Sequence, residues 1–114
     1  MKNTNFVPII DYCWIVHIEG IPSYLVKSAE RPIFKDGIWS PLKITLYNTT
    51  CFMLTPDNFD VSANYEIEIS YLDPIGNKAF KDTYSKQKVC LFQQSKLDYS
   101  SDEITLTNIH FKNS

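Results

Sequence analysis

The sequence predicts an all-β domain, mainly antiparallel, with at most one short helix. Several segments are rich in β-branched and aromatic residues, and they alternate apolar and polar side chains with a period of two. Turn-forming residues separate these segments, and the strand–helix–strand rhythm of a parallel sheet is missing. We therefore expect a small β-sandwich or barrel that occupies residues 1–114 as a single domain, since 114 residues are most simply one domain.

The N-terminal third is expected to form a hairpin that stops at a proline. Residues 12–19 are rich in β-branched and aromatic side chains, which favour a strand. The glycine and proline of residues 20–22 end that strand in a turn, and residues 24–27 are expected to return beside it. Arg31 and Pro32 then interrupt any sheet, because proline donates no backbone hydrogen bond to a neighbouring strand.

The next part of the chain predicts a turn, a half-buried strand and a short helical turn. Lys-Asp-Gly at residues 35–37 is a turn signal. Leu42–Tyr47 alternates cleanly, so its two leucines and its isoleucine are expected to face the core and its other side chains a polar surrounding. Residues 55–58 are expected to start a helical turn, with Thr55 at the N-cap and Pro56 at the first helical position.

Three further strands are expected in the C-terminal half. Residues 65–72 alternate between an apolar face and a polar face of Glu66, Glu68 and Ser70, and residues 73–77 form a turn. Residues 88–93 are apolar on both faces, as in a buried strand. Residues 103–111 form the last strand, whose alternation slips after Leu106. Either a β-bulge near Asn108 or an interface that buries both faces explains the slip.

Composition argues against several classes of protein. The net charge of −2 and the pI of about 5.6 leave no basic surplus to neutralise phosphates, which argues against a dedicated nucleic-acid binder. No apolar stretch approaches the ~20 residues of a membrane span, and no secretory signal is expected at the start of the chain. The chain has three cysteines, Cys13, Cys51 and Cys90, an odd number whose spacing fits no metal motif. We therefore expect buried thiols in a reducing compartment.

Candidate chemistry is sparse, and we expect neither an enzyme nor a bound cofactor or metal. His17 and His110 lie in separate expected strands, with no spacing that fixes a metal site or a cysteine–histidine pair. Glu66 and Glu68 have the spacing of an ordinary polar strand face. If several copies lined a channel, these two carboxylates would instead give it a negative wall that repels phosphate.

Four short strings, taken in order, carry a family resemblance. They are residues 27–34 (Lys-Ser-Ala-Glu-Arg-Pro-Ile-Phe), residues 39–47 (Trp-Ser-Pro-Leu-Lys-Ile-Thr-Leu-Tyr), residues 72–77 (Leu-Asp-Pro-Ile-Gly-Asn) and residues 97–102 (Leu-Asp-Tyr-Ser-Ser-Asp). Together with the aromatic first strand, this order resembles the tail tube proteins of contractile-tailed bacteriophages. The residues that match the family pattern are Arg31, Pro32, Trp39, Pro41, Tyr47, Asp73, Pro74, Gly76, Leu97, Asp98, Tyr99 and Asp102.

The resemblance implies a structural virion protein rather than a catalyst. Copies would assemble into hexameric rings, and stacked rings would form the channel for DNA ejection. Tail sheath and baseplate proteins would be the partners, and DNA would pass through without specific binding or any membrane contact. The protein would be assembled in the host bacterial cytoplasm and reside in the phage tail, with the matching residues setting packing and loop shape.

Two departures from the family keep other functions open. Family members carry a long segment where this chain has only residues 35–38, and a helix where it has residues 51–64. A shortened member could be a baseplate tube initiator or a tail-terminus ring protein of the same fold. An alternative of another class is a monomeric β-sandwich that binds a carbohydrate or protein ligand, with Trp39 and several tyrosines as a stacking platform.

Overall fold

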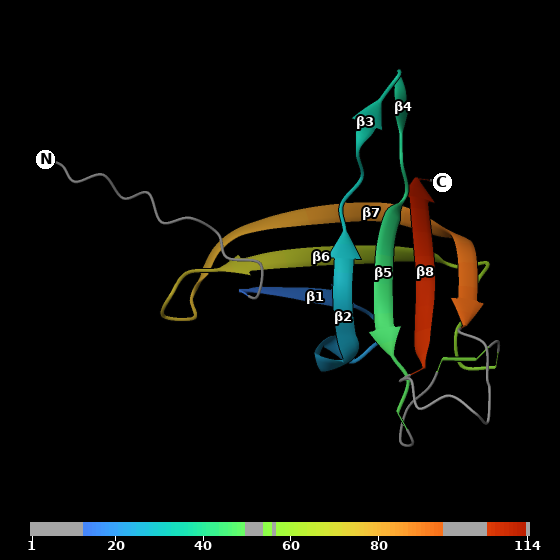
Figure 1. Ribbon diagram of the computed structural model, residues 1–114, viewed down its shortest axis with the longest axis horizontal. Helices are drawn as coiled ribbons and strands as arrows, with labels where there is room; N and C mark the ends of the chain where they lie inside the picture. The colour runs from blue at the N-terminus through green and yellow to red at the C-terminus, as the bar shows by residue number, and fades with distance from the viewer. Residues whose placement is uncertain (1–12, 50–53, 56, 95–104, 114) are drawn as a thin grey trace, which may run out of the picture.

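The computed structural model describes residues 13–49, 54–55, 57–94 and 105–113, and these residues are almost entirely antiparallel β-structure (Figure 1). This confirms the all-β prediction. The elements are β1 (Trp14–Ile18), the 3₁₀ turn η1 (Ser23–Leu25), β2 (Val26–Glu30), β3 (Phe34–Lys35), β4 (Ile38–Trp39), β5 (Leu42–Tyr47), β6 (Asn64–Leu72), β7 (Lys78–Gln94) and β8 (Leu106–Asn113). The described part of the chain contains no helix with the length and apolar character of a membrane span.

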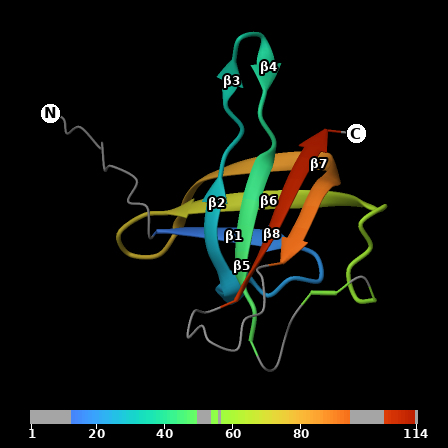
Figure 2. The ribbon, with the colours of Figure 1, turned by 45° about the vertical axis from the view of Figure 1, so that its right-hand side comes forward.

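Strand β7 joins two layers of one six-stranded sheet, whose order is β1-β6-β7-β8-β5-β2. The first half of this 17-residue strand pairs with β6, and its second half pairs with β8. Between the halves, Lys86 has a φ of 53°, and the register with β6 shifts there, as in a β-bulge. In Figures 1 and 2, β1 and β6 cross β2, β5 and β8 steeply, which is the arrangement of an orthogonal sandwich.

The core lies between the two layers and follows the alternation of the strands. The apolar faces of β1 and β6 pack against those of β5 and β8, and the fully buried members include Leu42, Ile44, Ile67, Ile109 and Phe111. The expected core faces of β5 and of residues 65–72 are therefore confirmed. Period-two alternation predicted them because successive strand side chains point to opposite faces of a sheet.

The N-terminal hairpin prediction is wrong. Strand β1 pairs with β6 over its whole length, while β2 pairs with β5 in the other layer. The residues that directly follow β1 form no strand beside it, and an isolated bridge between Ile18 and Ile21 is the backbone pairing found there. A 3₁₀ turn at residues 23–25 takes up the first part of the expected strand at residues 24–27, buries Leu25 and redirects the chain from one layer to the other.

The burial of two C-terminal strands also differs from expectation. Residues 88–93 are not a buried strand: Cys90 is exposed, at a register shift between Val89 and Leu91. The bulge expected near Asn108 is wrong, because β8 keeps an unbroken register with β5 there and buries Thr107, Ile109 and Phe111 in strict alternation, while Leu106 lies on the other face. Ser70 is fully buried on the polar face of β6, because its small side chain lies between Ile15 and Lys81 of the flanking strands.

The remaining local predictions have mixed outcomes. Arg31 and Pro32 do interrupt the sheet, because no strand includes them. The carbonyl of Thr55 accepts hydrogen bonds from the amides of Asn58 and Phe59, so a single turn forms there rather than an assigned helix. Cys13 is half-buried rather than buried. Pro56 and Cys51 lie outside the described residues.

Candidate functional site

A short hairpin, which we call the apolar arm (residues 33–40), projects from the top of β2 and β5 (Figures 1 and 2). Its turn residues Asp36 and Gly37 have φ values of 54° and 76°, the positive pair that a tight two-residue hairpin requires. At the base, the amide of Ser40 donates to the carbonyl of Ile33 at 2.9 Å, and the amide of Ile33 donates to Ser40 Oγ at 2.8 Å. These bonds fix the shape of the arm.

The arm exposes large apolar side chains. Ile33, Phe34, Ile38 and Trp39 are each between 52% and 69% exposed, and the rings of Phe34 and Trp39 meet edge to face at 5.2 Å. A contiguous apolar surface of this kind marks an interaction site in soluble proteins. Sequence reasoning found the turn but missed the arm, although Asp-Gly flanked by apolar residues is the strongest short-range hairpin signal.

The root of the arm is held by the Arg31 clamp, which we define as Arg31, Tyr71 and Asp82. Arg31 Nη1 donates to the Tyr71 hydroxyl at 3.2 Å, and that hydroxyl donates to Asp82 Oδ2 at 3.0 Å. The guanidinium carbon also lies 5.8 Å from the centroid of the Tyr71 ring. Burial, followed by the hydrogen bond to Asp82, raises the pKa of Tyr71 above its ordinary 10.0. The clamp thus ties the segment between β2 and the arm to β6 and β7.

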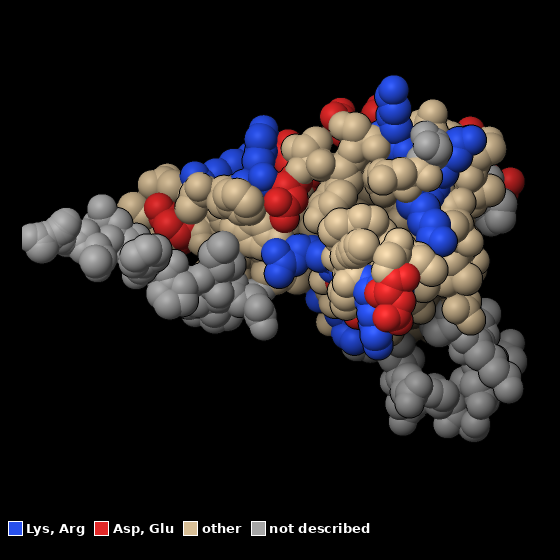
Figure 3. Space-filling view, turned by 90° about the horizontal axis from the view of Figure 1, so that it is seen from above, with Lys and Arg blue, Asp and Glu red and all other residues tan. Residues whose placement is uncertain are grey.

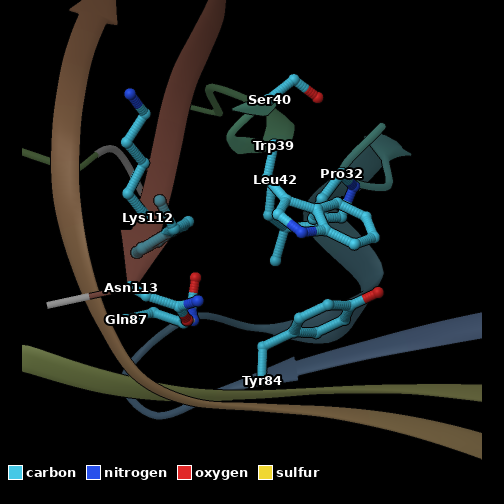
Figure 4. A pocket seen from close by; sticks show the side chains of 9 residues that line it. Pro32, Trp39, Ser40, Leu42, Tyr84, Gln87, Lys112 and Asn113 are labelled. Atoms are coloured by element: carbon cyan, nitrogen blue, oxygen red, sulfur yellow. The ribbon is translucent and has the colours of Figure 1, made fainter. Parts of the chain in front are cut away.

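A cavity of about 470 Å³, which we call the arm-root cavity, lies beneath the arm (Figure 4). Trp39 and Tyr84 lie on opposite sides of it, while Gln87 and Asn113 lie next to each other on a third side. Gln87 Nε2 donates to Asn113 Oδ1 at 2.6 Å and to the Ser85 carbonyl at 3.2 Å. The lining residues are Pro32, Trp39, Ser40, Leu42, Tyr84, Gln87, Phe111, Lys112 and Asn113.

The layer formed by β2, β5, β8 and the second half of β7 has two unpaired edges within the described residues. One edge is the outer side of β2, which pairs only with β5. The other is the outer side of β7 beyond Lys88, where pairing with β6 has ended. Each edge carries a register shift, next to Lys27 and Cys90 respectively. Unpaired edges present backbone donors and acceptors that another chain can pair with.

The predicted acidic pair lies in the other layer and is partly neutralised. Glu68 lies 3.8 Å from both Lys78 Nζ and Lys81 Nζ, and the hydrogen bond from Ser70 is the main cause that lowers its pKa, with the lysines contributing less. Glu66 accepts a hydrogen bond from Ser85 at 3.3 Å. Seen from the arm's end, charges of both signs mix on the surface (Figure 3). Whether Glu66 and Glu68 line a channel stays a prediction.

The residues that match the family pattern do not form one site. Arg31, Pro32, Trp39 and Pro41 gather at the arm, and Tyr47 ends β5 at the opposite end of that strand. The Asp73–Gly76 segment is a tight turn at the tip of β6 and β7, where Asp73 Oδ1 accepts from the amides of Ile75 and Asn77 and where the positive φ of Gly76 confirms the expected turn. The other predicted residues, Leu97, Asp98, Tyr99 and Asp102, lie outside the described residues.

The two histidines lie on different strands, in different layers of the sheet. His17 lies on β1 near the Ser23 hydroxyl, with 3.4 Å between Nδ1 and Oγ, while His110 lies on β8 opposite Lys43. Burial, with a smaller contribution from Lys43, lowers the pKa of His110 below its ordinary 6.5. Among the residues that the structure describes, no group of three or more His, Cys, Asp or Glu side chains could hold a metal ion.

Comparisons with known protein families, curated proteins and solved structures found no match for this chain. The likeness to tail tube proteins therefore rests on the ordered sequence strings alone.

Proposed function

We propose that this protein is a structural subunit that assembles edge to edge into rings, and that the rings stack into a tube similar to a phage tail tube. The observation that carries this proposal is the pair of unpaired edges on opposite sides of the β2–β5–β8–β7 layer. In the ring, the β2 edge of one copy pairs with the β7 edge of the next. Such a head-to-tail contact closes into a ring when the rotation from one copy to the next is a whole fraction of a full turn.

The apolar arm supports stacking of the rings. It extends beyond the end of β2, whereas the 3₁₀ turn lies at the start of that strand (Figure 1). Beside that turn is a mainly apolar groove, lined in part by Trp14, Val16, Tyr24 and Val26. An arm at one end and an apolar groove at the other allow each ring to contact the next in the same way, without limit. The arm's aromatic and aliphatic side chains supply the burial that such a contact needs.

The proposed ring also assigns a lining to the channel. The face of the β2–β5–β8–β7 layer that points away from the core carries Lys43, Thr45 and His110. If this layer lines the channel, Glu66 and Glu68 face outward. The acidic channel wall of Glu66 and Glu68, which the sequence predicts, requires instead that the layer of β1, β6 and the first half of β7 lines the channel.

A cross-linking experiment tests which edges meet. In a background with Cys13, Cys51 and Cys90 changed to serine, Ser28→Cys on β2 is combined with Gln93→Cys on β7. Oxidation is expected to give a ladder of covalent oligomers that ends at one closed species, because disulfides form only when Cα atoms approach within about 7 Å. The matched control combines Ser28→Cys with Thr83→Cys, an exposed β7 residue in the other layer, and is expected to stay monomeric on a denaturing gel.

Light scattering and negative-stain microscopy over a range of concentrations test the function itself. Rings that lengthen into filaments support a tube subunit. Single rings that never stack favour the second candidate, a baseplate initiator or tail-terminus ring protein of the same fold. A monomer that persists at high concentration would overturn assembly as the function, and would favour a binding module that uses the arm-root cavity.

A further inference from the structure

The arm-root cavity has the size and the aromatic walls of a small-molecule site. Its volume of about 470 Å³ lies within the range of roughly 300–1,000 Å³ that such sites occupy. The rings of Trp39 and Tyr84 lie on opposite sides of it, and Trp39 is 63% exposed (Figure 4). Leu42 and Phe111, both fully buried, add apolar surface to the same cavity. Aromatic rings on two sides of an apolar surface suit a flat ligand that stacks on them.

Gln87 brings to this cavity a buried amide whose acceptor has no partner. The residue is only 3% exposed and follows the register shift at Lys86. Its Nε2 donates one hydrogen to the Ser85 carbonyl and the other to Asn113 Oδ1. Within the described residues no group donates to Gln87 Oε1, and no side-chain polar atom there is both buried and unpaired, so Oε1 reaches open space. The arm-root cavity is the open space that Gln87 lines.

Asn113 places a free donor beside this free acceptor. Its Oδ1 accepts from Gln87, and its Nδ2 has no partner in the part of the chain that the structure describes. The two side chains lie next to each other on one side of the cavity (Figure 4). An amide oxygen accepts hydrogen bonds and an amide nitrogen donates them. The pair is therefore complementary to a ligand edge that carries a donor next to an acceptor.

The ligand is expected to be neutral, because no charge is directed into the cavity. Lys112 is the single charged residue among the described residues that line it, but its ammonium points away from Trp39, Tyr84 and Asn113 (Figure 4). Lys112 lies between Phe111 and Asn113 on β8, so its side chain leaves the opposite face of the strand. A ligand held through a phosphate or a carboxylate would find no cation to pair with it.

We propose that the arm-root cavity binds an adenine base. The base stacks between Trp39 and Tyr84. Its amino group donates to Gln87 Oε1, and a neighbouring ring nitrogen accepts from Asn113 Nδ2, the donor–acceptor pattern through which amide side chains recognise adenine.

Adenine suits this edge better than the other bases. Its amino group lies between two ring nitrogens that accept, N1 and N7, so the base matches the amide pair in either orientation. The N7 edge of guanine carries acceptors only, and it would leave Gln87 Oε1 unpaired. Pyrimidines offer a smaller ring to stack on Trp39 and Tyr84, and an aliphatic ligand would offer the amides no partner.

Binding is tested on the full chain with adenosine as the probe. Calorimetry on the unchanged chain gives the affinity. Trp14→Phe leaves Trp39 as the single tryptophan, so its fluorescence reports contact with the base. Purine riboside, which lacks only the amino group, is the control ligand. We expect saturable binding of adenosine that is about tenfold tighter than binding of purine riboside, which leaves Gln87 Oε1 unpaired.

Two substitutions locate the binding. Trp39→Leu is expected to weaken adenosine binding by about tenfold or more, because it removes a stacking surface. Its control is Tyr24→Leu, which removes an aromatic ring that is 82% exposed outside the cavity. Asn113→Ala is expected to weaken adenosine and purine riboside alike, since both keep the ring nitrogens, while the exposed Asn77→Ala at the β6–β7 turn leaves both unchanged.

Several outcomes would overturn the adenine assignment. They are equal affinity for adenosine and purine riboside, tighter binding of uridine, no saturation up to about 10 mM adenosine, or normal binding by both Trp39→Leu and Asn113→Ala. A short oligodeoxyadenylate that binds more tightly than adenosine, with an affinity that falls as salt rises, identifies a nucleic-acid strand as the source of the base. Equal or weaker binding of the oligonucleotide identifies the free nucleoside. Because binding is measured at the cavity and not through assembly, its failure leaves the ring proposal untouched.

Discussion

At the scale of single residues, the Arg31 clamp joins three polar side chains in one chain of hydrogen bonds. Arg31 is the chain's single arginine, and its partners Tyr71 and Asp82 come from two neighbouring strands. The Tyr71 side chain is almost completely buried, and its hydroxyl is both an acceptor and a donor. The sequence marked Arg31 as part of the family-like string at residues 27–34. The alternation of residues 65–72 gave no sign that the Tyr71 hydroxyl forms a hydrogen bond with Arg31.

Removing the Tyr71 hydroxyl tests the clamp. Tyr71→Phe is expected to lower the free energy of unfolding by about 1–3 kcal/mol, because Arg31 and Asp82 each lose a hydrogen-bond partner. Urea denaturation of the two proteins gives this difference. The control is Tyr24→Phe, which changes a hydroxyl on a side chain that is 82% exposed and is expected to change stability by less than about 0.5 kcal/mol.

The same residue gives a pH signature. The pKa of Tyr71 is raised in the folded state, so the folded protein keeps this proton at a pH where the unfolded chain has lost it. The stabilisation is complete below pH 10.0, the ordinary value, and is lost as the pH rises toward the folded pKa. Tyr71→Phe should therefore weaken the fall in stability above this pH, and an unchanged alkaline profile would contradict the clamp.

At the scale of elements, the arm is the part of the chain that the sequence described least well. Lys-Asp-Gly was recognised as a turn, but the strands on either side are only two residues long, too short for alternation to show. An isolated two-stranded hairpin is marginal in water, so the side chains of β3 and β4 gain most from burial against another surface. The arm is therefore expected to matter for assembly and little for folding.

An exposed isoleucine on the arm provides the test of this division. Ile38→Ser should change the free energy of unfolding by less than about 0.5 kcal/mol and should abolish growth beyond single rings, because it removes apolar surface only from the arm. Ile75→Ser is the matched control, since Ile75 is 81% exposed at the distant β6–β7 turn and should leave stacking intact. Filaments of normal length from Ile38→Ser would count against the stacking role of the arm.

At the scale of the whole molecule, β7 makes the two layers depend on each other. Because each half of this strand belongs to a different layer, neither layer keeps its full set of strands if the other unfolds. The shared core has the same consequence, since Phe111 of β8 lies with its ring edge to face against Tyr65 of β6 at 6.0 Å. We therefore expect the described strands to unfold together.

A conservative core change tests this cooperation. Ile109→Val, at a fully buried position of β8, is expected to destabilise the protein by about 0.5–1.5 kcal/mol. Circular dichroism, which reports on all strands, and tryptophan fluorescence, which includes Trp14 of the other layer, should shift to the same new midpoint. Two separate midpoints would show that the layers unfold independently.

The sequence by itself determined the strands that alternate clearly, namely β1, β5, β6 and β8, which faces of β5 and β6 are buried, and where the tight turns at residues 36–37 and 73–76 lie. These features depend on side-chain alternation and on the backbone preferences of a few residues, so they can be read locally. The resemblance singled out Arg31 and Trp39 in two successive strings, but gave no contact for either residue.

The tertiary structure alone decided that β1 pairs with β6, that β7 serves both layers, and that Trp39, Tyr84 and Asn113 surround one cavity. Alternation determines which face of a strand is buried, but it does not determine which strand pairs with it. Several strands of this chain have similar apolar faces, so the sequence pattern alone allows each of them as a partner. The choice among neighbours depends on how all the strands close around one core. The unpaired edges, and with them the proposed ring, are a consequence of that closure.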